Sequence, residues 1–358
     1  MEDNKIPMKK VIMANMCLLL AAMLWGSQIA FQKTAAGIMN PVGFYTSRCI
    51  CGSLVMAIIV LFMEWKKRRD EAKAGVPHKP YGKDYFRKLF IIAPPCSLLN
   101  MAGQIVAQAG LRYTTASKAG FLTAIYVVFV PIVALIIFRQ ATTILTWLGS
   151  VMAVIGLYYL SMSETLTIGT GDLLIISSAI PFATHIVLLS KLVKRFQGVH
   201  FTLVEFTTIA IIGSIYCLIF RPDTAEQIRA CIPSILYCGV LGVGVCYALQ
   251  VTGQKYTDPT VAALIISLES VFAAVTGFLV LGESFTSKEF LGAVLIFASV
   301  IIAQIPVKPL GRAKGSVSPS PAAEEIEYPA AVAEVSEQSS IAEDQGQNTA
   351  EHSSGTGA

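Results

Sequence analysis

The chain has 358 residues, of which 54% are hydrophobic and only 14% charged, and its mean hydropathy is +0.64. A soluble domain carries about 25% charged residues, so a water-soluble enzyme or binding module is excluded for most of the length. The net charge of +4 is small, and membrane topology and lipid head groups explain the basic clusters better than nucleic-acid binding does.

Apolar stretches long enough to cross a bilayer follow one another along the chain. A membrane-spanning helix needs about 20 largely apolar residues. We expect ten such spans, at Val11–Phe31, Val42–Met63, Leu89–Ala109, Ala116–Phe138, Thr142–Ser161, Leu173–Leu192, Phe201–Phe220, Ile232–Val251, Thr260–Leu281 and Glu289–Ile305. The first follows three lysines as a signal peptide would, but its apolar run is too long, so we interpret it as a retained span.

The segments outside the spans are polar. Residues 1–10 are expected to form a short N-terminus, and residues 64–88 a long basic loop. From residue 307 to residue 358 the composition changes to Ala, Ser, Pro, Gln and Gly with several acidic residues. That composition is typical of a disordered tail.

The lysines and arginines are distributed unevenly between the two sides of the predicted membrane. If the N-terminus is cytoplasmic, 20 of the 27 fall on the cytoplasmic side and 6 on the outer side, with Arg48 inside a span. Positive charge is retained in the cytoplasm. We therefore expect a multi-pass protein of the cell membrane with both termini cytoplasmic.

The cysteines carry no metal or redox motif. Eight are present, all in or beside apolar spans, with no C-x-x-C and no His/Cys cluster at metal-ligand spacing. We interpret them as reduced packing residues, and we expect no metal and no cofactor.

The second half of the hydrophobic region repeats the first. Gly110 aligns with Gly253 at a shift of 143 residues, and Tyr113 then falls on Tyr256. Upstream, Arg48 falls on Glu205 at a shift of 157, and the extra residues of the first half fit in the basic loop. An internal repeat in a protein of many spans is typical of a transporter.

Five spans in each half is an odd number, so the two halves must cross the membrane in opposite orientations. The predicted fold class is therefore an all-α integral membrane protein of ten transmembrane helices arranged as two inverted five-helix repeats. The repeats are expected at residues 11–161 and 172–306. Inverted repeats place the substrate site near the bilayer midplane between them.

Several motifs occur in the order and spacing of one known family. They are Leu24-Trp25-Gly26, Leu122–Phe129, Gly171-Asp172-Leu173-Leu174 and Leu268–Ala274 followed by Gly282-Glu283. Over roughly residues 11–306 the sequence resembles the drug/metabolite transporter superfamily, and within it the EamA-type exporters. Ser270 and Val127 stand where that family has proline, which weakens the transfer of a particular substrate. The last span of each half can form a dimer contact in that family, so a homodimer is possible here.

Two charged residues occupy equivalent positions in the second and seventh spans. Polar groups in the bilayer are costly, so Arg48 and Glu205 are candidates for a structural or coupling role. Each either reaches its near interface or bonds a neighbouring helix. Because the halves are inverted, we expect the pair to lie near opposite faces of the membrane without a salt bridge.

Glu269 lies about ten residues inside its span, too deep to reach the interface. It either binds a substrate amine or a proton, or it makes a buried hydrogen bond between helices. Tyr126 occupies the equivalent position in the first half, at the shift of 143 residues that defines the repeat. We place both residues in the wall of a central cavity.

Further polar residues of the spans are expected to face this cavity. Asn100 and Gln104 lie on one polar stripe of the third span, and Tyr247 of the eighth span is the mate of Gln104. Gln28 and His185 are mates on the first and sixth spans, and the histidine is either a cavity residue or a contact between helices.

The sequence holds no catalytic motif, so we expect no enzyme and no catalytic residue. A channel is disfavoured because no filter motif is present. We predict a secondary transporter that exports small organic metabolites, such as amino acids or related compounds, by alternating access. The alternative is a lipid-carrier flippase or a nucleotide-sugar carrier of the same fold. Its partners are then a small-molecule substrate and the lipid bilayer, and no nucleic acid.

Overall fold

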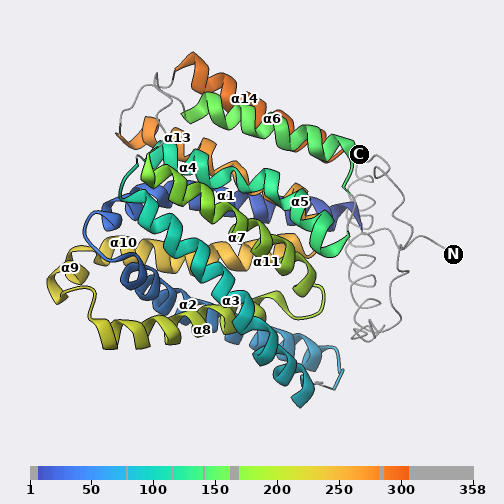
Figure 1. Cartoon of the computed structure of the whole chain (residues 1–358). Coiled ribbons are helices and arrows are strands. Elements are labelled where there is room, and N and C mark those ends of the chain that lie inside the picture. The colour runs from blue at the N-terminus through green and yellow to red at the C-terminus, as the bar shows by residue number, and fades with distance from the viewer. Residues whose placement is uncertain are drawn as a thin grey trace, which may run out of the picture. The chain divides into compact units, whose positions relative to one another are not determined.

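The computed structural model describes residues 7–77, 80–114, 116–139, 142–161, 169–281 and 286–305. All regular elements within these ranges are helices (Figure 1). They are α1 (Met8–Ala36), α2 (Pro41–Lys73), α3 (Lys83–Leu111), α4 (Ala116–Ala124), α5 (Tyr126–Phe138), α6 (Ile144–Ser161), α7 (Thr170–Leu192), α8 (Gly198–Phe220), α9 (Ala225–Ala230), α10 (Ile232–Tyr237), the π-helix η1 (Cys238–Val245), α11 (Cys246–Gln254), α12 (Pro259–Ser267), α13 (Glu269–Leu281) and α14 (Ser287–Ala303).

The chain divides into two compact units. The larger comprises Met1–Val60 and Lys83–Gly315, and it holds every helix except the C-terminal part of α2. The smaller comprises Leu61–Gly82 and Ser316–Ala358, of which the structure describes the end of α2 and the turn that follows it. The predicted tail at 307–358 lies outside the described residues.

Eight helical segments of the described chain are long and apolar enough to cross a membrane. Two of them are built from consecutive short helices, α4–α5 and α12–α13, and a third joins α10, η1 and α11. The helix α6 is apolar but shorter. The protein is therefore a multi-pass membrane protein whose described elements are all helices.

The bounds predicted for the basic loop, residues 64–88, are wrong at both ends, because helices extend into the segment from each side. The helix α2 continues to Lys73, and α3 begins at Lys83. The residues between Glu64 and Lys73 are mainly lysine, arginine, glutamate and alanine, which favour helix in water as well as in lipid. The chain therefore extends α2 beyond its apolar stretch, and the loop is confined to residues 74–82.

Two spans are interrupted at equivalent positions of the repeat. Ile125 separates α4 from α5, and Leu268 separates α12 from α13. These two residues are related by the same shift of 143 that aligns Gly110 with Gly253. At both residues the backbone keeps right-handed helical angles, so each span is locally distorted rather than unwound at this point.

Helices of the two halves pack on one another in matching pairs. A Cβ on Gly110 of α3 would lie 2.7 Å from the Gly171 carbonyl of α7, and one on Gly253 of α11 would lie 2.7 Å from the Ala14 carbonyl of α1. The third span of each half thus packs on the first span of the other half. The helices α6 and α14 pair directly, since Gly156 of α6 and Gly292 of α14 bring their backbones together (Figure 1).

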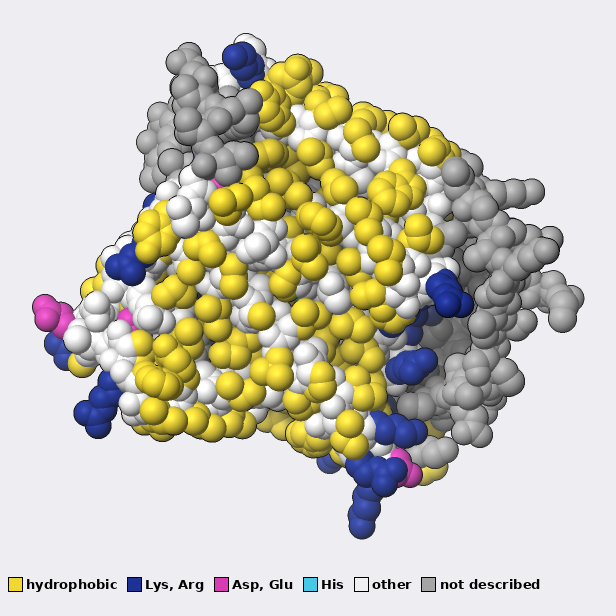
Figure 2. All heavy atoms as spheres, viewed as in Figure 1, with side chains coloured by type: hydrophobic (Ala, Val, Ile, Leu, Met, Phe, Trp, Pro, Cys, Tyr) yellow, Lys and Arg dark blue, Asp and Glu magenta, His cyan; other side chains and the backbone are white. Residues whose placement is uncertain are grey.

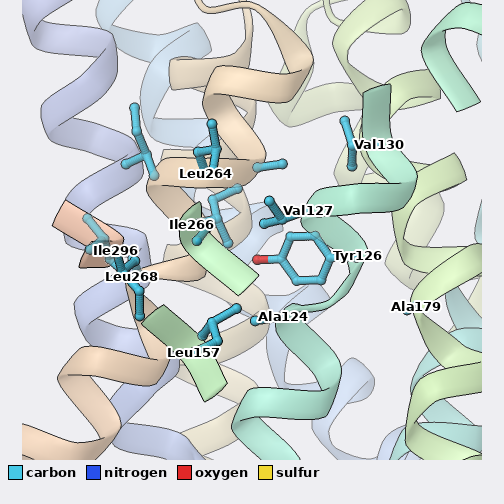
Figure 3. Close-up of a cluster of buried hydrophobic side chains, with 14 of the residues drawn as sticks. Ala124, Tyr126, Val127, Val130, Leu157, Ala179, Leu264, Ile266, Leu268 and Ile296 are labelled. Atoms are coloured by element: carbon cyan, nitrogen blue, oxygen red, sulfur yellow. The ribbon is translucent and has the colours of Figure 1, made fainter. Parts of the chain in front are cut away.

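Apolar side chains form both the interior and the outer surface of the larger unit. One core cluster joins Tyr126, Val127 and Val130 of α5 with Leu264 and Ile266 of α12 (Figure 3). A second cluster lies among α2, α3, α7, α8 and α11. The face shown in Figure 2 is covered mainly by hydrophobic side chains, with lysine and arginine near its margins, as lipid contact requires.

Candidate functional site

A cavity lies within the larger unit, walled by α1, α2, α3, α4, α5, α7, α11, α12 and α13. The centres of water molecules can occupy about 130 Å³ of it. One water needs about 10–15 Å³ of such space, so the cavity has room for several waters or a small organic molecule. Its polar lining residues are Gln28, Gln32, Arg48, Gln104, Thr123, Tyr126, His185, Tyr247, Gln250 and Glu269.

Most of the predicted cavity residues lie in this wall. They are Gln28, Gln104, Tyr126, His185, Tyr247 and Glu269. Asn100 does not line the cavity, because its side chain is fully buried and turned toward Glu205. Arg48 lines the cavity, whereas Glu205 lies behind the wall.

Arg48 is held in place by polar and aromatic neighbours. It is only 4% exposed, and its Nη2 donates to Gln104 Oε1 at 2.7 Å. Its guanidinium lies 4.8 Å from the centre of the Tyr45 ring, a cation–π contact that partly replaces the water it has lost. The Nε of Arg48 is buried without a hydrogen-bond partner in the described residues. A guanidinium that lines a cavity and has no carboxylate partner among the described residues is suited to bind an anionic group.

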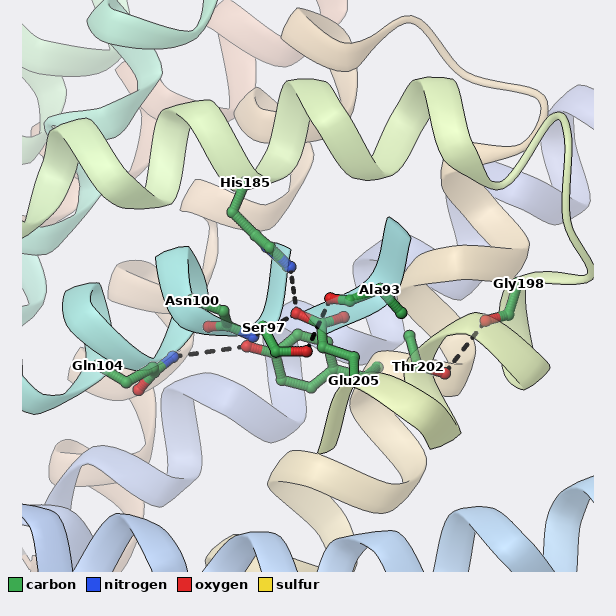
Figure 4. A network of polar contacts seen from close by, with 9 residues as sticks. Ala93, Ser97, Asn100, Gln104, His185, Gly198, Thr202 and Glu205 are labelled. Carbon is green, nitrogen blue, oxygen red and sulfur yellow. Dashed lines mark hydrogen bonds and ion pairs between the residues drawn. The ribbon is translucent and has the colours of Figure 1, made fainter. Parts of the chain in front are cut away.

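Glu205 is the centre of a buried polar network behind the wall (Figure 4). His185 Nε2 lies 2.6 Å from Glu205 Oε1, and Asn100 Nδ2 donates to the same oxygen at 3.0 Å. Figure 4 shows His185 pointing from α7 toward the carboxylate on α8. The network joins α3, α7 and α8, and one of its members, His185, also reaches the cavity.

The expectation that Arg48 and Glu205 lie near opposite faces is wrong. Arg48 bonds Gln104 and Glu205 bonds Asn100, four residues apart on α3. That spacing is one helical turn, about 6 Å along the axis. Both side chains are long and extend from their own helices toward the same part of α3. The position of each residue along its helix therefore does not show where its charged group lies. The two residues bond α3 rather than each other.

Glu269 and Tyr126 lie at the interruptions of their spans. Each is the first residue of the second short helix, α13 and α5 respectively, and each lines the cavity. The Tyr126 hydroxyl is buried without a hydrogen-bond partner in the described chain. The Glu269 carboxylate has no hydrogen bond or ion pair with any residue that the structure describes. Its cavity position makes it available to a ligand.

Trp25 and Gln28 connect α1 to the π-helix. Trp25 Nε1 donates to the Gly242 carbonyl at 3.0 Å, and a Cβ on Gly242 would lie 1.9 Å from Gln28 Oε1. The absence of a Cβ at Gly242 leaves room for the end of the Gln28 side chain. π-Helical turns are frequent at functional sites, and here the turn lies beside two cavity residues.

Polar contacts tie the helix ends beside one part of the cavity. Lys118 of α4 forms an ion pair with Asp172 of α7, and Thr114 donates to the same carboxylate at 2.7 Å. Lys33 of α1 donates to the Leu111 carbonyl at 2.8 Å and the Thr114 carbonyl at 2.6 Å. Asp172, part of a motif noted in the sequence, also accepts from the Gly169 backbone N–H at 2.8 Å at the start of α7.

Sequence reasoning missed several cavity residues. Gln250 follows Tyr247 by three residues on α11, so helical periodicity from Tyr247 could have indicated it. Gln32 follows Gln28 by four residues and could have been found in the same way. Trp25 and Thr123 lie in motifs noted in the sequence, but those motifs did not indicate that the two side chains line a cavity. Phe182 carried no such signal, because aromatic residues are common throughout membrane helices.

Comparisons with known proteins identify the family. The model of the EamA-like transporter family matches residues 12–162 and again residues 169–304. The chain belongs to the EamA-like transporter family. An EamA-like chain with several apolar spanning helices is a membrane transporter.

Relatives agree with this assignment. A protein of Archaeoglobus fulgidus described as an uncharacterized transporter is 29% identical over 83% of this EamA-like chain and 88% of its own length. The uncharacterized transporter YoaV of Bacillus subtilis is 19% identical over 80% of this chain and 94% of its own. A solved crystal structure with 13% identity covers 82% of this chain and 98% of its own, with a TM-score of 0.61, which shows a shared fold.

Proposed function

We propose that the protein is a secondary transporter, without enzymatic activity, that exports small organic metabolites from the cell by alternating access. The observation that carries this proposal is one cavity lined by both a cation, Arg48, and a carboxylate, Glu269, from different halves of the chain. A zwitterionic ligand such as an amino acid would present an anion to the first and a cation to the second. Trp25 and Phe182 supply apolar wall for the rest of such a molecule.

The proposal includes ten membrane crossings arranged as two inverted repeats. The helices α6 and α14 would be the fifth crossing of each half. The matching interruptions at Ile125 and Leu268 and the exchanged packing of first and third spans support this symmetry. Alternating access then follows from rocking of the two repeats about the cavity between them. Both termini would face the cytoplasm at the cell membrane, as the distribution of lysine and arginine favours.

Transport requires contacts that close one end of the cavity and can later be released. The Lys118–Asp172 ion pair and the Lys33 bonds to the carbonyls of Leu111, the last residue of α3, and Thr114 are candidates for such a closure. Leu111 and Ala119, which line the cavity, are neighbours of these contacts in the chain. Opening this end would require the pair to separate.

A counterflow experiment tests the proposal. The purified protein is reconstituted in liposomes loaded with one member of a metabolite panel, and uptake of the same labelled compound is measured with and without a pH gradient. We expect saturable uptake that is accelerated by the loaded compound, with amino acids and related zwitterions preferred. Flux that rises linearly with concentration and ignores the loaded compound would contradict a carrier. Uptake that depends on a lipid or nucleotide-sugar head group instead would favour the alternative carrier class.

A further inference from the structure

A cysteine, a histidine and a glutamate from three helices converge behind the cavity. Cys96 of α3, His185 of α7 and Glu205 of α8 each offer one ligand atom, and these atoms all lie within 4.8 Å of one another. All three side chains are buried, at 4%, 3% and 0% exposure. Sequence spacing indicated no such cluster, because its members are distant in the chain and meet only in the folded bundle. We propose that Cys96, His185 and Glu205 bind a divalent transition metal ion of the zinc class.

The donor set is the first argument. A thiolate sulfur, an imidazole nitrogen and a carboxylate oxygen are the three ligand types that zinc uses in proteins. Calcium and magnesium prefer oxygen ligands alone, so a site that includes sulfur and nitrogen disfavours them. Zinc bonds are about 2.0–2.3 Å long, which places the ligand atoms of one ion about 3–4 Å apart. The three atoms already lie within 4.8 Å of one another, and the His185–Glu205 contact of 2.6 Å would widen to admit the ion.

Charge balance is the second argument. A charge without compensation is costly in the membrane interior. With an ion bound, the Cys96 thiolate and the Glu205 carboxylate would together carry two negative charges, and His185 would be neutral as a ligand. A divalent ion makes the site neutral, whereas a monovalent ion would leave a net negative charge. Among ions that these three residues could bind, the charge balance therefore favours a dication.

Unpartnered polar atoms are the third argument. Glu205 Oε2 and Asn100 Oδ1 are buried, and neither has a hydrogen-bond partner among the described residues. A buried acceptor without a partner costs about 1–3 kcal/mol. The His185–Glu205 contact uses only Oε1 and does not explain either atom. An ion at the cluster would give the carboxylate oxygen Oε2 a partner.

Access and rigidity complete the site. His185 also lines the cavity, so an ion can reach the cluster from that side. Cys96 directly follows Pro94 and Pro95 inside α3, where two backbone N–H donors are missing from the helix ladder. An ion that joins α3, α7 and α8 at this point would hold the weakened helix against its neighbours.

Cobalt binding tests the proposal on the full-length protein. The protein is purified in detergent, stripped with a chelator and titrated with Co²⁺, whose thiolate complexes absorb in the near ultraviolet. We expect one ion per chain, a thiolate-to-cobalt absorption band, and loss of that band when Zn²⁺ is added. Cys96→Ala and Cys96→Ser should abolish the band. Cys246→Ala, which removes another buried thiol, should retain it.

Two further measurements make the result decisive. Glu205→Gln should weaken cobalt binding at least tenfold, because it removes one of two anionic ligands. Zn²⁺ should raise the unfolding temperature of the wild type and of Cys246→Ala but not of Cys96→Ser. Absence of the band in the wild type, or its survival in both Cys96 variants, would overturn the proposal. None of these readouts uses transport, so a failure of the proposed export function would leave the metal result unaffected.

Discussion

Glu269 is the residue whose position argues most directly for a role in transport. It begins α13 at an interruption of its span and lines the cavity. It makes no hydrogen bond or ion pair with a described residue that would compensate its charge. A carboxylate inside a membrane protein is retained only where a partner or water stabilises it. A ligand that enters the cavity can supply that partner.

We therefore expect Glu269→Gln to reduce counterflow of a zwitterionic substrate by about 10- to 100-fold, because a hydrogen bond to a charged group contributes about 1.5–3 kcal/mol. Initial rates in proteoliposomes measure the effect. Glu226→Gln changes an exposed glutamate of α9 and should leave the rates unchanged. Wild-type rates in Glu269→Gln, at equal amounts of folded protein, would remove this carboxylate from the mechanism.

The sequence could indicate most of the polar cavity wall, because a polar side chain deep in an apolar span is rare and therefore informative. Gln28, Gln104, His185 and Glu269 were recognised in this way, and Tyr126 and Tyr247 as the counterparts of Glu269 and Gln104 in the repeat. It could not indicate which neighbour each residue bonds. Asn100 and Gln104 share a stripe on α3, yet the first bonds Glu205 and the second bonds Arg48. Four residues turn a helix by slightly more than one full turn, so members of a stripe face different neighbours.

At the scale of helices, close packing decides where glycine is required. Gly26 of α1 faces α13, and a Cβ there would lie 2.4 Å from the Glu269 carbonyl and 2.8 Å from the Ala273 nitrogen. Both are backbone atoms that cannot rotate away. Gly26 thus allows α1 to approach the helix that carries Glu269.

Gly26→Ala should destabilise the protein by about 1–3 kcal/mol, the usual cost of overpacking. The expected result is a lower midpoint of thermal unfolding in detergent. Gly37 is the matched control, because a Cβ there would meet only the Thr34 carbonyl at 3.6 Å. Gly37→Ala should unfold at the wild-type temperature. An unchanged midpoint for Gly26→Ala would show that α1 and α13 pack less closely than the structure has them.

The start of α2 depends on a carboxylate from a distant loop. Asp223 Oδ1 accepts from the Asn40 backbone N–H at 2.6 Å, and its Oδ2 is buried without a partner in the described chain. Burial raises the pKa of Asp223, and the Asn40 N–H opposes that shift only in part. Because the pKa is raised on folding, protonation stabilises the folded protein. That stabilisation is complete below the ordinary pKa of about 3.9 and is lost as the pH rises through the raised value.

We expect Asp223→Asn to keep an oxygen acceptor for Asn40 without the charge. The unfolding temperature of the variant relative to the wild type should therefore rise between about pH 4 and pH 7. Measuring the difference between the two proteins cancels the titration of all other groups. A difference that does not change with pH, or that falls, would contradict the raised pKa.

Helix positions follow from the sequence because long apolar runs have one stable form in lipid. The interruptions at Ile125 and Leu268 do not, since isoleucine and leucine in apolar runs carry no breaking signal. The extension of α2 to Lys73 was missed because hydropathy marks where lipid ends, while helix propensity decides where the helix ends. Hydropathy alone therefore cannot locate the interruptions, which depend on tertiary packing, or the end of α2, which depends on helix propensity.

At the scale of the whole molecule, an internal duplication of the chain accounts for the way the helices of its two halves pack on one another. The family model matches twice, the interruptions correspond, and each half packs its third span on the first span of the other. A site between two such halves is built from equivalent positions that have diverged in chemistry. Tyr126 and Glu269 are one such pair, and Gln28 and His185 are another.

The proposed inversion of the halves predicts which residues share a side of the membrane. An odd number of crossings in each half places the segments after the second and sixth spans on the cytoplasmic side, where most lysines and arginines are expected. Lys66 and Lys194 mark these segments, Arg229 marks the opposite side, and all three are exposed. In a variant without the native cysteines, we expect Lys66→Cys and Lys194→Cys to react with an impermeant maleimide only after the cells are permeabilised. Arg229→Cys should react in intact cells. If Lys66→Cys and Lys194→Cys were labelled from different sides, the two halves could not be inverted five-helix repeats, and alternating access between them would have no structural basis.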